Sequence, residues 1–427
     1  MSILLPDPHA TLNAALPTIE PLDPVRLASA KTAYTTRFVC RLIASDANGY
    51  GLVTGDHVIP QAGDVVLARV LKLGQHGGIQ RPDGRRATLF EGDEILVAYG
   101  DRYAPDQFEA EVPDNLGLTH LVAGGGLAGT VISSHAQMGA ATRLEPLGLL
   151  TDAGGTVTLR RCAPYMAVAA EDPRLLLRLG KPAVIGVLGT SMNSGKTTTV
   201  ASIVRGLSKA GLKVAAGKVT GTGAGGDPLL FHDSGASRIL DFTDFGYGST
   251  YRVEHEEIRA LLVSLIGELA ATGPDVVVVE VADGLLQAET AALVADPLFK
   301  QQVDKVVFAA GEALGAKAGQ ILLAAHGIAP VAISGMLTTS PLAKREAATA
   351  LDVPVLGKEE LSSAQIADLL LPGYVKPGVS GSPRPASSVN PSSTSDGTSS
   401  LPPKCLTCGI DCTVPLPASF AINTMAG

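Results

Sequence analysis

The stretch VIGVLGTSMNSGKTTTV, residues 184–200, decides the fold. An apolar segment predicts a strand over 183–188, a turn of glycine and small polar residues follows, and a helix begins where the turn ends. That helix has one apolar face, made by Val200, Ile203, Val204 and Leu207. The order strand, glycine-rich turn, helix is the context of a P-loop, in which backbone N–H groups surround phosphate oxygens at a helix N-terminus. The alternative is that SGKT occurs by chance in an ordinary turn. This alternative is disfavoured because GKT lies where the apolar strand ends and the helix begins.

Ten consecutive residues form the predicted nucleotide-binding set. They are Gly189, Thr190, Ser191, Met192, Asn193, Ser194, Gly195, Lys196, Thr197 and Thr198. Lys196 is placed to reach the terminal phosphates, and the hydroxyl of Thr197 is placed to bind Mg²⁺. The predicted cofactors are ATP and Mg²⁺, although the sequence does not separate ATP from GTP.

Composition indicates a globular α/β protein and excludes several classes. The 427 residues are 46% hydrophobic and include 48 glycines, and no stretch of the length of a membrane span is free of charged and turn residues. The opening MSILLPDPHA lacks the basic region of a secretory signal, so a cytoplasmic location is expected. A net charge of -8 with scattered basic residues argues against nucleic acid as a partner. Five cysteines are too few for a disulfide framework in this chain.

The N-terminal third of the chain has the pattern of a β domain. Residues 1–33 are rich in proline and predict an extended arm, and 34–170 predict a barrel or sandwich of short strands. The predicted strands cover 64–72, 87–90, 94–98 and 156–160. Gly124, Gly126 and Gly129 match the spacing of a dinucleotide-binding motif, but a β-branched run follows them instead of a helix, so a glycine-rich turn is preferred.

Residues 180–373 predict a parallel sheet that helices cover on both faces. After the strand at 183–188, further strands are expected at 213–216, 275–281, 305–309, 331–333 and 353–356, and amphipathic helices at 258–269 and 313–325. The predicted fold class is therefore α/β, with a parallel-sheet P-loop NTPase domain after a smaller β-rich domain.

The last segment, 374–427, is predicted to be a disordered linker and a tail. Residues 380–400 contain nine serines, which favours disorder. Cys405, Cys408 and Cys412 follow with the spacing C-x₂-C-x₃-C. Three thiolates suggest zinc or an iron–sulfur cluster, but no fourth ligand is evident, and an unstructured tail or a peptide read by another enzyme stays open.

The P-loop departs from the usual pattern in a way that indicates a family. Thr190 occupies the position of the first glycine and Gly189 lies one residue earlier, which gives the form GTxxxxGKT. This form resembles dethiobiotin synthetase. Residues 217–221, GKVTG, look like that family's GKPV segment, and the strand before Glu280 looks like its strand with a terminal acidic residue. Segments 311–328, 330–337 and 353–357 resemble the last units of the family, and the chain is also similar to an uncharacterised group of P-loop proteins that share ADGLLQxET.

The resemblance implies roles for three residues and has limits. It implies that Lys218 faces a reacting carboxyl or carbamate group and that Glu280 holds Mg²⁺ with Thr197. Ser191 stands where the synthetase has aspartate, and residues 221–252 are a long insertion, so we expect a different substrate. In this insertion Asp227 is the favoured acidic residue, as a substrate or second metal ligand, and Asp283 is a second substrate candidate; helix capping is the alternative for Asp283.

Three functions therefore follow as hypotheses. The first is an ATP- and Mg²⁺-dependent kinase or ligase that activates a small carboxylate or carbamate by phosphoryl transfer, with Lys196, Lys218 and Glu280 as catalytic residues. The second is a nucleotide-dependent adapter or chaperone in cofactor biosynthesis, similar to the P-loop protein of molybdopterin-guanine dinucleotide synthesis. The third is a polynucleotide kinase, because a β domain before a P-loop occurs in that class. The expected partner is a small carboxylate or amine, without a membrane, and a homodimer is an arrangement that the sequence leaves open.

Overall fold

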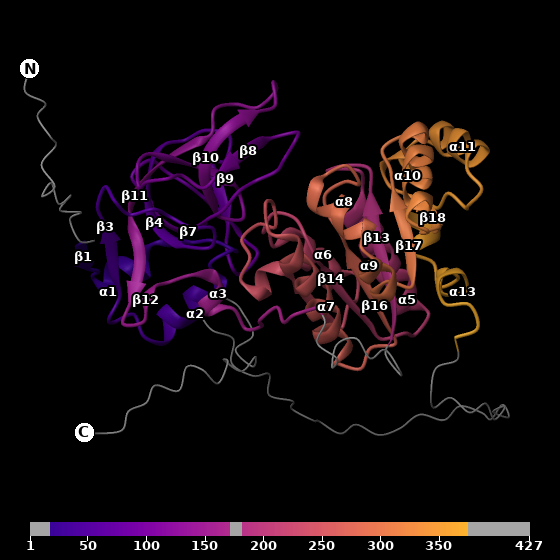
Figure 1. Ribbon diagram of the computed structural model, residues 1–427, viewed down its shortest axis with the longest axis horizontal. Coiled ribbons are helices and arrows are strands. Elements are labelled where there is room, and N and C mark those ends of the chain that lie inside the picture. The colour runs from indigo at the N-terminus through magenta and orange to yellow at the C-terminus, as the bar shows by residue number, and fades with distance from the viewer. Residues whose placement is uncertain (1–17, 171–181, 375–427) are drawn as a thin grey trace, which may run out of the picture.

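The computed structural model describes residues 18–170 and 182–374, which form two parts, one rich in strands and one of mixed helices and strands (Figure 1). The first half of the predicted arm, the linker and Cys405, Cys408 and Cys412 lie outside the described residues. Residues 18–33, predicted as arm, instead belong to the strand-rich part. They form β1 (Thr18–Pro21), α1 (Pro24–Ser29) and β2 (Lys31–Thr32). β1 pairs with β3 (Gly51–Thr54), and Asp23 caps α1.

Five strands of the first part pair in a closed ring. The ring runs β4 (Val65–Lys72), β7 (Glu94–Tyr99), β10 (Leu127–Ser134), β9 (Thr119–Ala123) and β11 (Thr142–Asp152), and β11 returns to β4. Side chains alternate along these strands: Val66 and Ala68 enter the core inside the ring, and Val65 and Leu67 enter a second core beneath the helices. Of the two predicted architectures, the pairing therefore favours the closed one.

The remaining elements of this part extend or cover the ring. They are β8 (Phe108–Glu111), β12 (Gly155–Thr156), the hairpin of β5 (Gly78–Gln80) and β6 (Arg86–Thr88), α2 (Arg37–Ser45) and α3 (Leu159–Cys162). The predicted strand at 156–160 is wrong in its second half. The hydroxyl of Thr158 accepts a hydrogen bond from the backbone of Arg161 and so starts α3 there.

The second part contains a parallel sheet, as the sequence predicts, and this sheet has six strands. The order is β15 (Arg238–Asp241), β14 (Val214–Lys218), β16 (Val276–Glu280), β13 (Ala183–Gly189), β17 (Lys305–Ala309) and β18 (Pro330–Ser334). Along β13, Val184 and Leu188 enter the core on one face, and Ile185 and Val187 enter the core on the other. Both faces are thus buried, which explains why these strands read as continuous apolar runs.

Helices cover both faces of this sheet (Figure 1). On one face lie α7 (His255–Ala270), α8 (Ala288–Ala295), α9 (Pro297–Gln302) and α10 (Ala313–Ala325), and on the other lie α5 (Lys196–Lys209), α6 (Gly226–Asp233), α12 (Lys358–Leu361) and α13 (Ile366–Leu370). The short helices η2 (Met336–Thr339) and α11 (Pro341–Ala350) follow β18. None of the described helices is both long and apolar enough to cross a membrane.

Two features of the second part differ from the sequence-based expectation. Residues 353–356 do not form a strand; they make one bridge, between Val355 and Ile333. The insertion at 221–252 is not a plain loop, because it contains α6, the edge strand β15 and the helix η1 (Phe242–Phe245). Only four residues pair in β15, which is too short for a periodic signal in the sequence.

Candidate functional site

The P-loop joins β13 to α5 at the edge where the parallel strands end. Gly195 precedes the helix with φ of 96°, and a Cβ there would lie 3.0 Å from the backbone of Gly335. Asn193 also has a positive φ, of 60°. The Nζ of Lys196 donates to the carbonyl oxygen of Ser191 at 2.8 Å, so the lysine closes over the loop. This geometry places a buried ammonium group and the first N–H groups of α5 around one point, as phosphate binding requires.

Lys218 and Glu280 lie side by side because they end neighbouring strands. β14 and β16 are parallel, and their register pairs these two residues. The Nζ of Lys218 lies 3.6 Å from Oε1 of Glu280 and forms a short ion pair with Asp227, at the start of α6. The sequence therefore predicted a set of residues that the structure brings together.

Burial sets the electrostatics of this group. It raises the pKa of Glu280, and the ammonium groups of Lys218 and Lys196 act against that rise. Burial also lowers the pKa of Lys196. For Lys218 burial acts in the same direction, but the carboxylates of Glu280 and Asp227 outweigh it and raise its pKa well above the usual value. Lys218 is therefore a permanent cation held between two carboxylates.

Thr197 and Glu280 fit a magnesium ion bound together with nucleotide phosphates. The second carboxylate oxygen of Glu280, Oε2, is buried and has no hydrogen-bond partner among the described residues, and Thr197 lines the same cavity. No group of three His, Cys, Asp or Glu residues within 18–170 and 182–374 is arranged to hold a metal. One carboxylate, one hydroxyl and phosphate oxygens are a usual ligand set for Mg²⁺, which keeps several waters.

A cavity of about 780 Å³ lies between the P-loop and the strand-rich part. The second part contributes the P-loop, Lys218, Asp227, Glu280 and Asp283 to its lining. The strand-rich part contributes His76, Gln80, Arg86, Arg102 and Gln107, together with the turn at Gly124 and Gly125. Sequence analysis missed the polar residues of this wall, because single polar residues in short strands and loops have no characteristic spacing. Of the glycines of the weak dinucleotide motif, Gly124 and Gly126 form a turn between β9 and β10, as preferred from the sequence, and Gly129 lies in β10.

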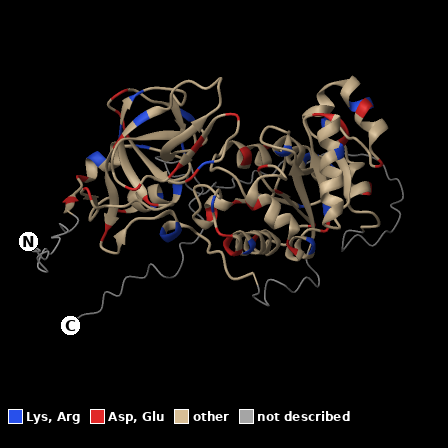
Figure 2. Ribbon diagram, turned by 45° about the horizontal axis from the view of Figure 1, so that its top comes forward, with Lys and Arg blue, Asp and Glu red and all other residues tan. Residues whose placement is uncertain are grey.

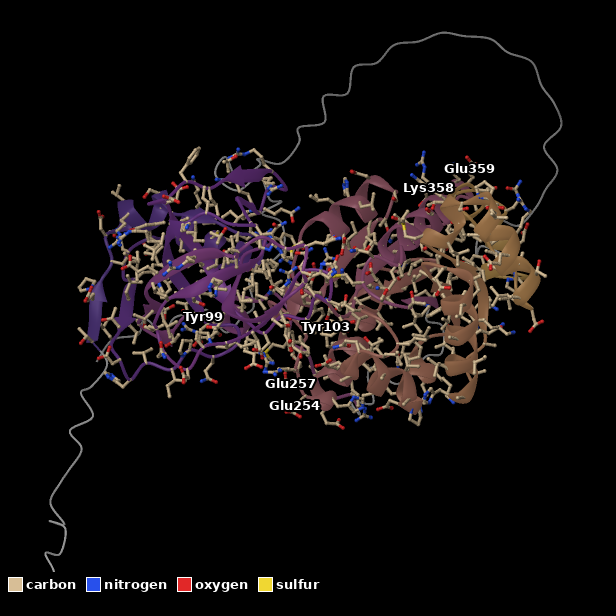
Figure 3. The ribbon with its side chains drawn as sticks, turned by 90° about the horizontal axis from the view of Figure 1, so that it is seen from above. Tyr99, Tyr103, Glu254, Glu257, Lys358 and Glu359 are labelled. Atoms are coloured by element: carbon tan, nitrogen blue, oxygen red, sulfur yellow. The ribbon has the colours of Figure 1, made fainter. Side chains whose placement is uncertain are left out.

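The two parts contact each other closely around this cavity. The side-chain oxygen of Gln80 accepts a hydrogen bond from the backbone of Gly225, and Asn193 of the P-loop donates to Asp106. The ring of Tyr103 lies against that of Tyr251, with centroids 5.5 Å apart, and Figure 3 shows Tyr103 where the two parts meet. The walls of the cavity are therefore held together by contacts from both parts.

The other acidic residues of the insertion have different positions. Asp233 is exposed, and Asp241 and Asp244 form ion pairs with Arg37 at the contact between the parts. Asp227 and Asp283 line the cavity, and burial raises the pKa of Asp283. Gln287 caps α8, and Glu289 accepts a hydrogen bond from the backbone of Arg252. Roles for Asp227 and Asp283 toward a substrate or second metal stay predictions.

Gly125 is a position where the parts touch backbone to backbone. A Cβ on Gly125 would lie 1.8 Å from the carbonyl oxygen of Gly223. We expect Gly125→Ala to lower the free energy of unfolding by about 1–3 kcal/mol, the usual cost of overpacking, and to weaken nucleotide binding by displacing the cavity wall. Gly77→Ala is the matched control, because a Cβ on Gly77 meets no atom within 4 Å. Denaturant unfolding and nucleotide titration measure both effects; equal stability of the two variants would contradict the close contact.

Comparisons with known proteins give no closer identification. No family model matches the chain, and no curated protein matches it in sequence. Among solved structures, the signal recognition particle receptor FtsY from Elizabethkingia anophelis, in complex with GDP, is 16% identical, with a TM-score of 0.33 over 45% of this chain and 65% of that one. The 54 kDa signal recognition particle protein of Aeropyrum pernix K1, in complex with GDP, is 17% identical, with a TM-score of 0.33 over 47% of this chain and 49% of that one. Chloroplast FtsY from Physcomitrella patens is 18% identical, with a TM-score of 0.32 over 45% and 66%.

These TM-scores and identities carry no argument about activity, and the chain spans less than two thirds of each matched protein. None of these three is a dethiobiotin synthetase, so that finer resemblance stays a prediction. What stands is the geometry: a strand, a glycine-rich loop and a helix at the edge of a parallel sheet, with a buried lysine and an acidic residue at the end of the neighbouring strand. The protein is therefore identified at the level of its fold only, as an α/β protein with a P-loop at the edge of a parallel sheet.

Proposed function

We propose that the protein is an ATP- and Mg²⁺-dependent enzyme that transfers the terminal phosphoryl group of the nucleotide to a small carboxylate or carbamate. The observation that carries the proposal is the convergence of Lys196, Lys218 and Glu280 on one side of a cavity that the strand-rich part covers. Phosphoryl transfer needs positioning and charge stabilisation more than covalent chemistry, and these residues supply both.

In the proposed step, a carboxylate oxygen of the acceptor attacks the terminal phosphorus. The new P–O bond forms as the bond to the bridging oxygen breaks, so ADP leaves and an acyl phosphate remains. In a ligase an amine then attacks the acyl carbon and releases phosphate. Lys196 stabilises charge on the transferred group, and Lys218 orients the attacking oxygen. Mg²⁺ held by Thr197, Glu280 and phosphate oxygens would neutralise charge on the phosphates.

The dimensions of the cavity support a small-molecule acceptor over the alternatives. A volume of about 780 Å³ is in the usual range for small-molecule sites. A polynucleotide kinase needs a basic path for a phosphate backbone, whereas Figure 2 shows Lys and Arg interspersed with Asp and Glu over both parts. An adapter would present a protein-binding surface, and its hydrolysis would rise with a protein partner.

The experiment that tests the proposal is a screen for nucleotide-dependent turnover. Purified protein is incubated with ATP or GTP and Mg²⁺ against a library of carboxylic acids and amino acids, with and without amines, and ADP or GDP is measured. Release that depends on one small molecule supports the proposal. Release that only an RNA 5′-hydroxyl end or a protein partner stimulates would favour a different function. The same preparation, in analytical ultracentrifugation, tests whether the chain forms the homodimer that the sequence leaves open.

Lys218 gives a prediction that separates binding from chemistry. We expect Lys218→Ala to lower acceptor-dependent turnover by about 10²–10³-fold, the usual loss on removing one stabilising donor, and to keep nucleotide affinity nearly unchanged. Nucleotide titration and steady-state kinetics measure the two quantities. Because the change leaves Glu280 and Asp227 without their cation, a melting curve must show that the variant is folded, and Lys218→Gln serves as a second variant. Nucleotide affinity that falls as far as turnover would reject the role of Lys218.

A further inference from the structure

Two arginines are buried among residues 18–170 and 182–374, and they differ in their counter-ions. The guanidinium of Arg37 lies 2.8 Å from Asp244 and 3.6 Å from Asp241. Arg102 is equally buried, at 4% exposure, but no carboxylate of the described residues lies within ion-pair distance of it. Its guanidinium donates to the side-chain oxygen of Gln107 at 2.7 Å and contacts Nε2 of His76 at 3.3 Å. Arg102 is thus a buried cation without an ion pair, and the carboxylates of Asp106 and Asp283 act on it only from beyond ion-pair distance.

Such a cation is costly unless an anion reaches it. A buried charge is stable only when it is paired or well solvated, because transfer out of water is strongly unfavourable. The Nε of Arg102 has no hydrogen-bond partner among the described residues, and burial lowers the pKa of Arg102 to about 10. Arg102 also lines the cavity. An anionic ligand in the cavity could therefore supply the direct partner that Arg102 lacks.

The backbone holds Arg102 against the P-loop side of the cavity. The N–H of Arg102 donates to Ala110 at 2.8 Å, and the N–H of Ala110 donates back at 3.0 Å, so β8 fixes the residue. Four residues later, Asp106 accepts a hydrogen bond from Asn193 of the P-loop. The carboxyl of Asp283 also lies within electrostatic range of Lys196, Lys218 and Arg102. Lys196, Lys218 and Arg102 therefore surround a common region. The strand-rich part contributes Arg102 to it.

We propose that Arg102 binds an oxygen of the nucleotide's terminal phosphate from the wall opposite Lys196. The inference rests on the proposed function, since it needs a nucleotide in the P-loop. The contact between Asp106 and Asn193 favours the phosphate over the acceptor carboxylate, because it places the loop carrying Arg102 directly on the phosphate-binding turn. A planar guanidinium binds two oxygens of a phosphate at once, which a lysine cannot do. The strand-rich part thus takes part in recognising the triphosphate.

The test compares triphosphate with diphosphate affinity in the full-length protein. Arg102→Gln is expected to weaken binding of the non-hydrolysable ATP analogue with a β,γ-imido bridge by roughly 10-fold to 100-fold, as for loss of a hydrogen bond to a charged group. Affinity for ADP should stay within about threefold, because ADP has no terminal phosphate at this position. The matched control is Arg85→Gln, which removes the same charge from an exposed position outside the cavity lining and should change neither affinity.

Stability gives a readout that a purely structural role would not produce. Since Arg102 is buried without an ion pair, and its burial outweighs the attraction of Asp106 and Asp283, its replacement by glutamine should leave the melting temperature of the nucleotide-free protein unchanged or higher. A structural role predicts a lower melting temperature. Arg102→Lys, which keeps the charge and loses the planar fork, should give a triphosphate affinity between those of the wild type and Arg102→Gln.

Three results would overturn the proposal. An equal loss of ADP and analogue affinity places Arg102 on the inner phosphates or on the fold. Unchanged nucleotide affinities with a raised KM for the acceptor assign Arg102 to the acceptor carboxylate. Both results leave the proposed function standing. If the wild-type protein binds neither nucleotide, the proposed function fails, and this inference fails with it.

Discussion

Replacing Lys196 with alanine is expected to lower nucleotide turnover by about 10²–10³-fold or more, since it removes a preorganised cation from the transferred phosphoryl group. Lys196 is buried at the start of α5, and its Nζ is held by Ser191 within the loop that would surround the phosphates. Steady-state measurement of ADP or GDP release gives the effect. Loss should appear in triphosphate binding as well as in turnover, in contrast to Lys218→Ala.

Lys209→Ala is the control for Lys196, because Lys209 ends the same helix. Its Nζ is exposed and donates to the carbonyl oxygen of Ser362, on the side of the helix away from the loop. The control should keep wild-type turnover. Retained turnover in Lys196→Ala would show that the phosphates are bound elsewhere, and would remove the basis of the proposed step.

The second large effect concerns stability and involves Arg37. Replacing Arg37 with methionine is expected to lower the free energy of unfolding by about 3–5 kcal/mol, because it leaves the buried carboxylates of Asp241 and Asp244 without their cation. The hydroxyl of Tyr34 also donates to Asp241, so the change disturbs a network that joins the two parts. Urea unfolding followed by circular dichroism measures the loss. Arg26→Ala, which removes an ion pair whose arginine is 41% exposed, should cost no more than about 1 kcal/mol.

The effect of Arg37→Met should depend on pH in a defined direction. Burial already raises the pKa of Asp244 in the wild type, and loss of Arg37 removes the charge that opposes this rise. When the pKa of a carboxyl group is higher in the folded state than in the unfolded state, folding favours the protonated group. The free energy of unfolding therefore falls as the pH rises past the unfolded-state pKa toward the folded-state pKa. The difference between variant and wild type should therefore be largest at neutral pH and shrink on acidification. A constant difference would show that packing, and not charge, sets the cost.

Secondary structure was predicted correctly from the sequence where an apolar pattern continues over a long segment. The strands at 183–188 and 305–309 and the helix at 313–325 are close to their predicted positions, because packing on both faces leaves a continuous apolar pattern. It failed at β15, which is four residues long, and at 353–356, where the backbone of Leu356 bonds to Ile333 without extending the sheet. Short elements are set by tertiary contacts, which no local pattern records.

Only the wall of the cavity that the P-loop part forms could be predicted from the sequence. Lys196, Lys218 and Glu280 follow apolar strands, and the ends of parallel strands meet at one edge of a sheet, so their proximity follows from order alone. No such rule predicts that Arg102 and Gln107 line the cavity, because they lie in a loop whose position depends on how the two parts pack. Tyr99 and Tyr103 illustrate this: four residues apart, one lies within the strand-rich part and the other at the boundary (Figure 3).

The division of the cavity between two parts has a consequence for how such a protein diversifies. Lys196 and Glu280 are fixed by β13, β16 and α5, whose spacing the parallel sheet dictates, whereas Gln80 and Arg86 belong to the hairpin of β5 and β6. Substitutions in that hairpin alter the wall that faces the ligand without disturbing the strand ends. Acceptor preference can therefore change through this hairpin while the P-loop side stays constant. Directed evolution toward a new acceptor is best begun by randomising residues 81–86, with Gln80 kept because it accepts a hydrogen bond from Gly225.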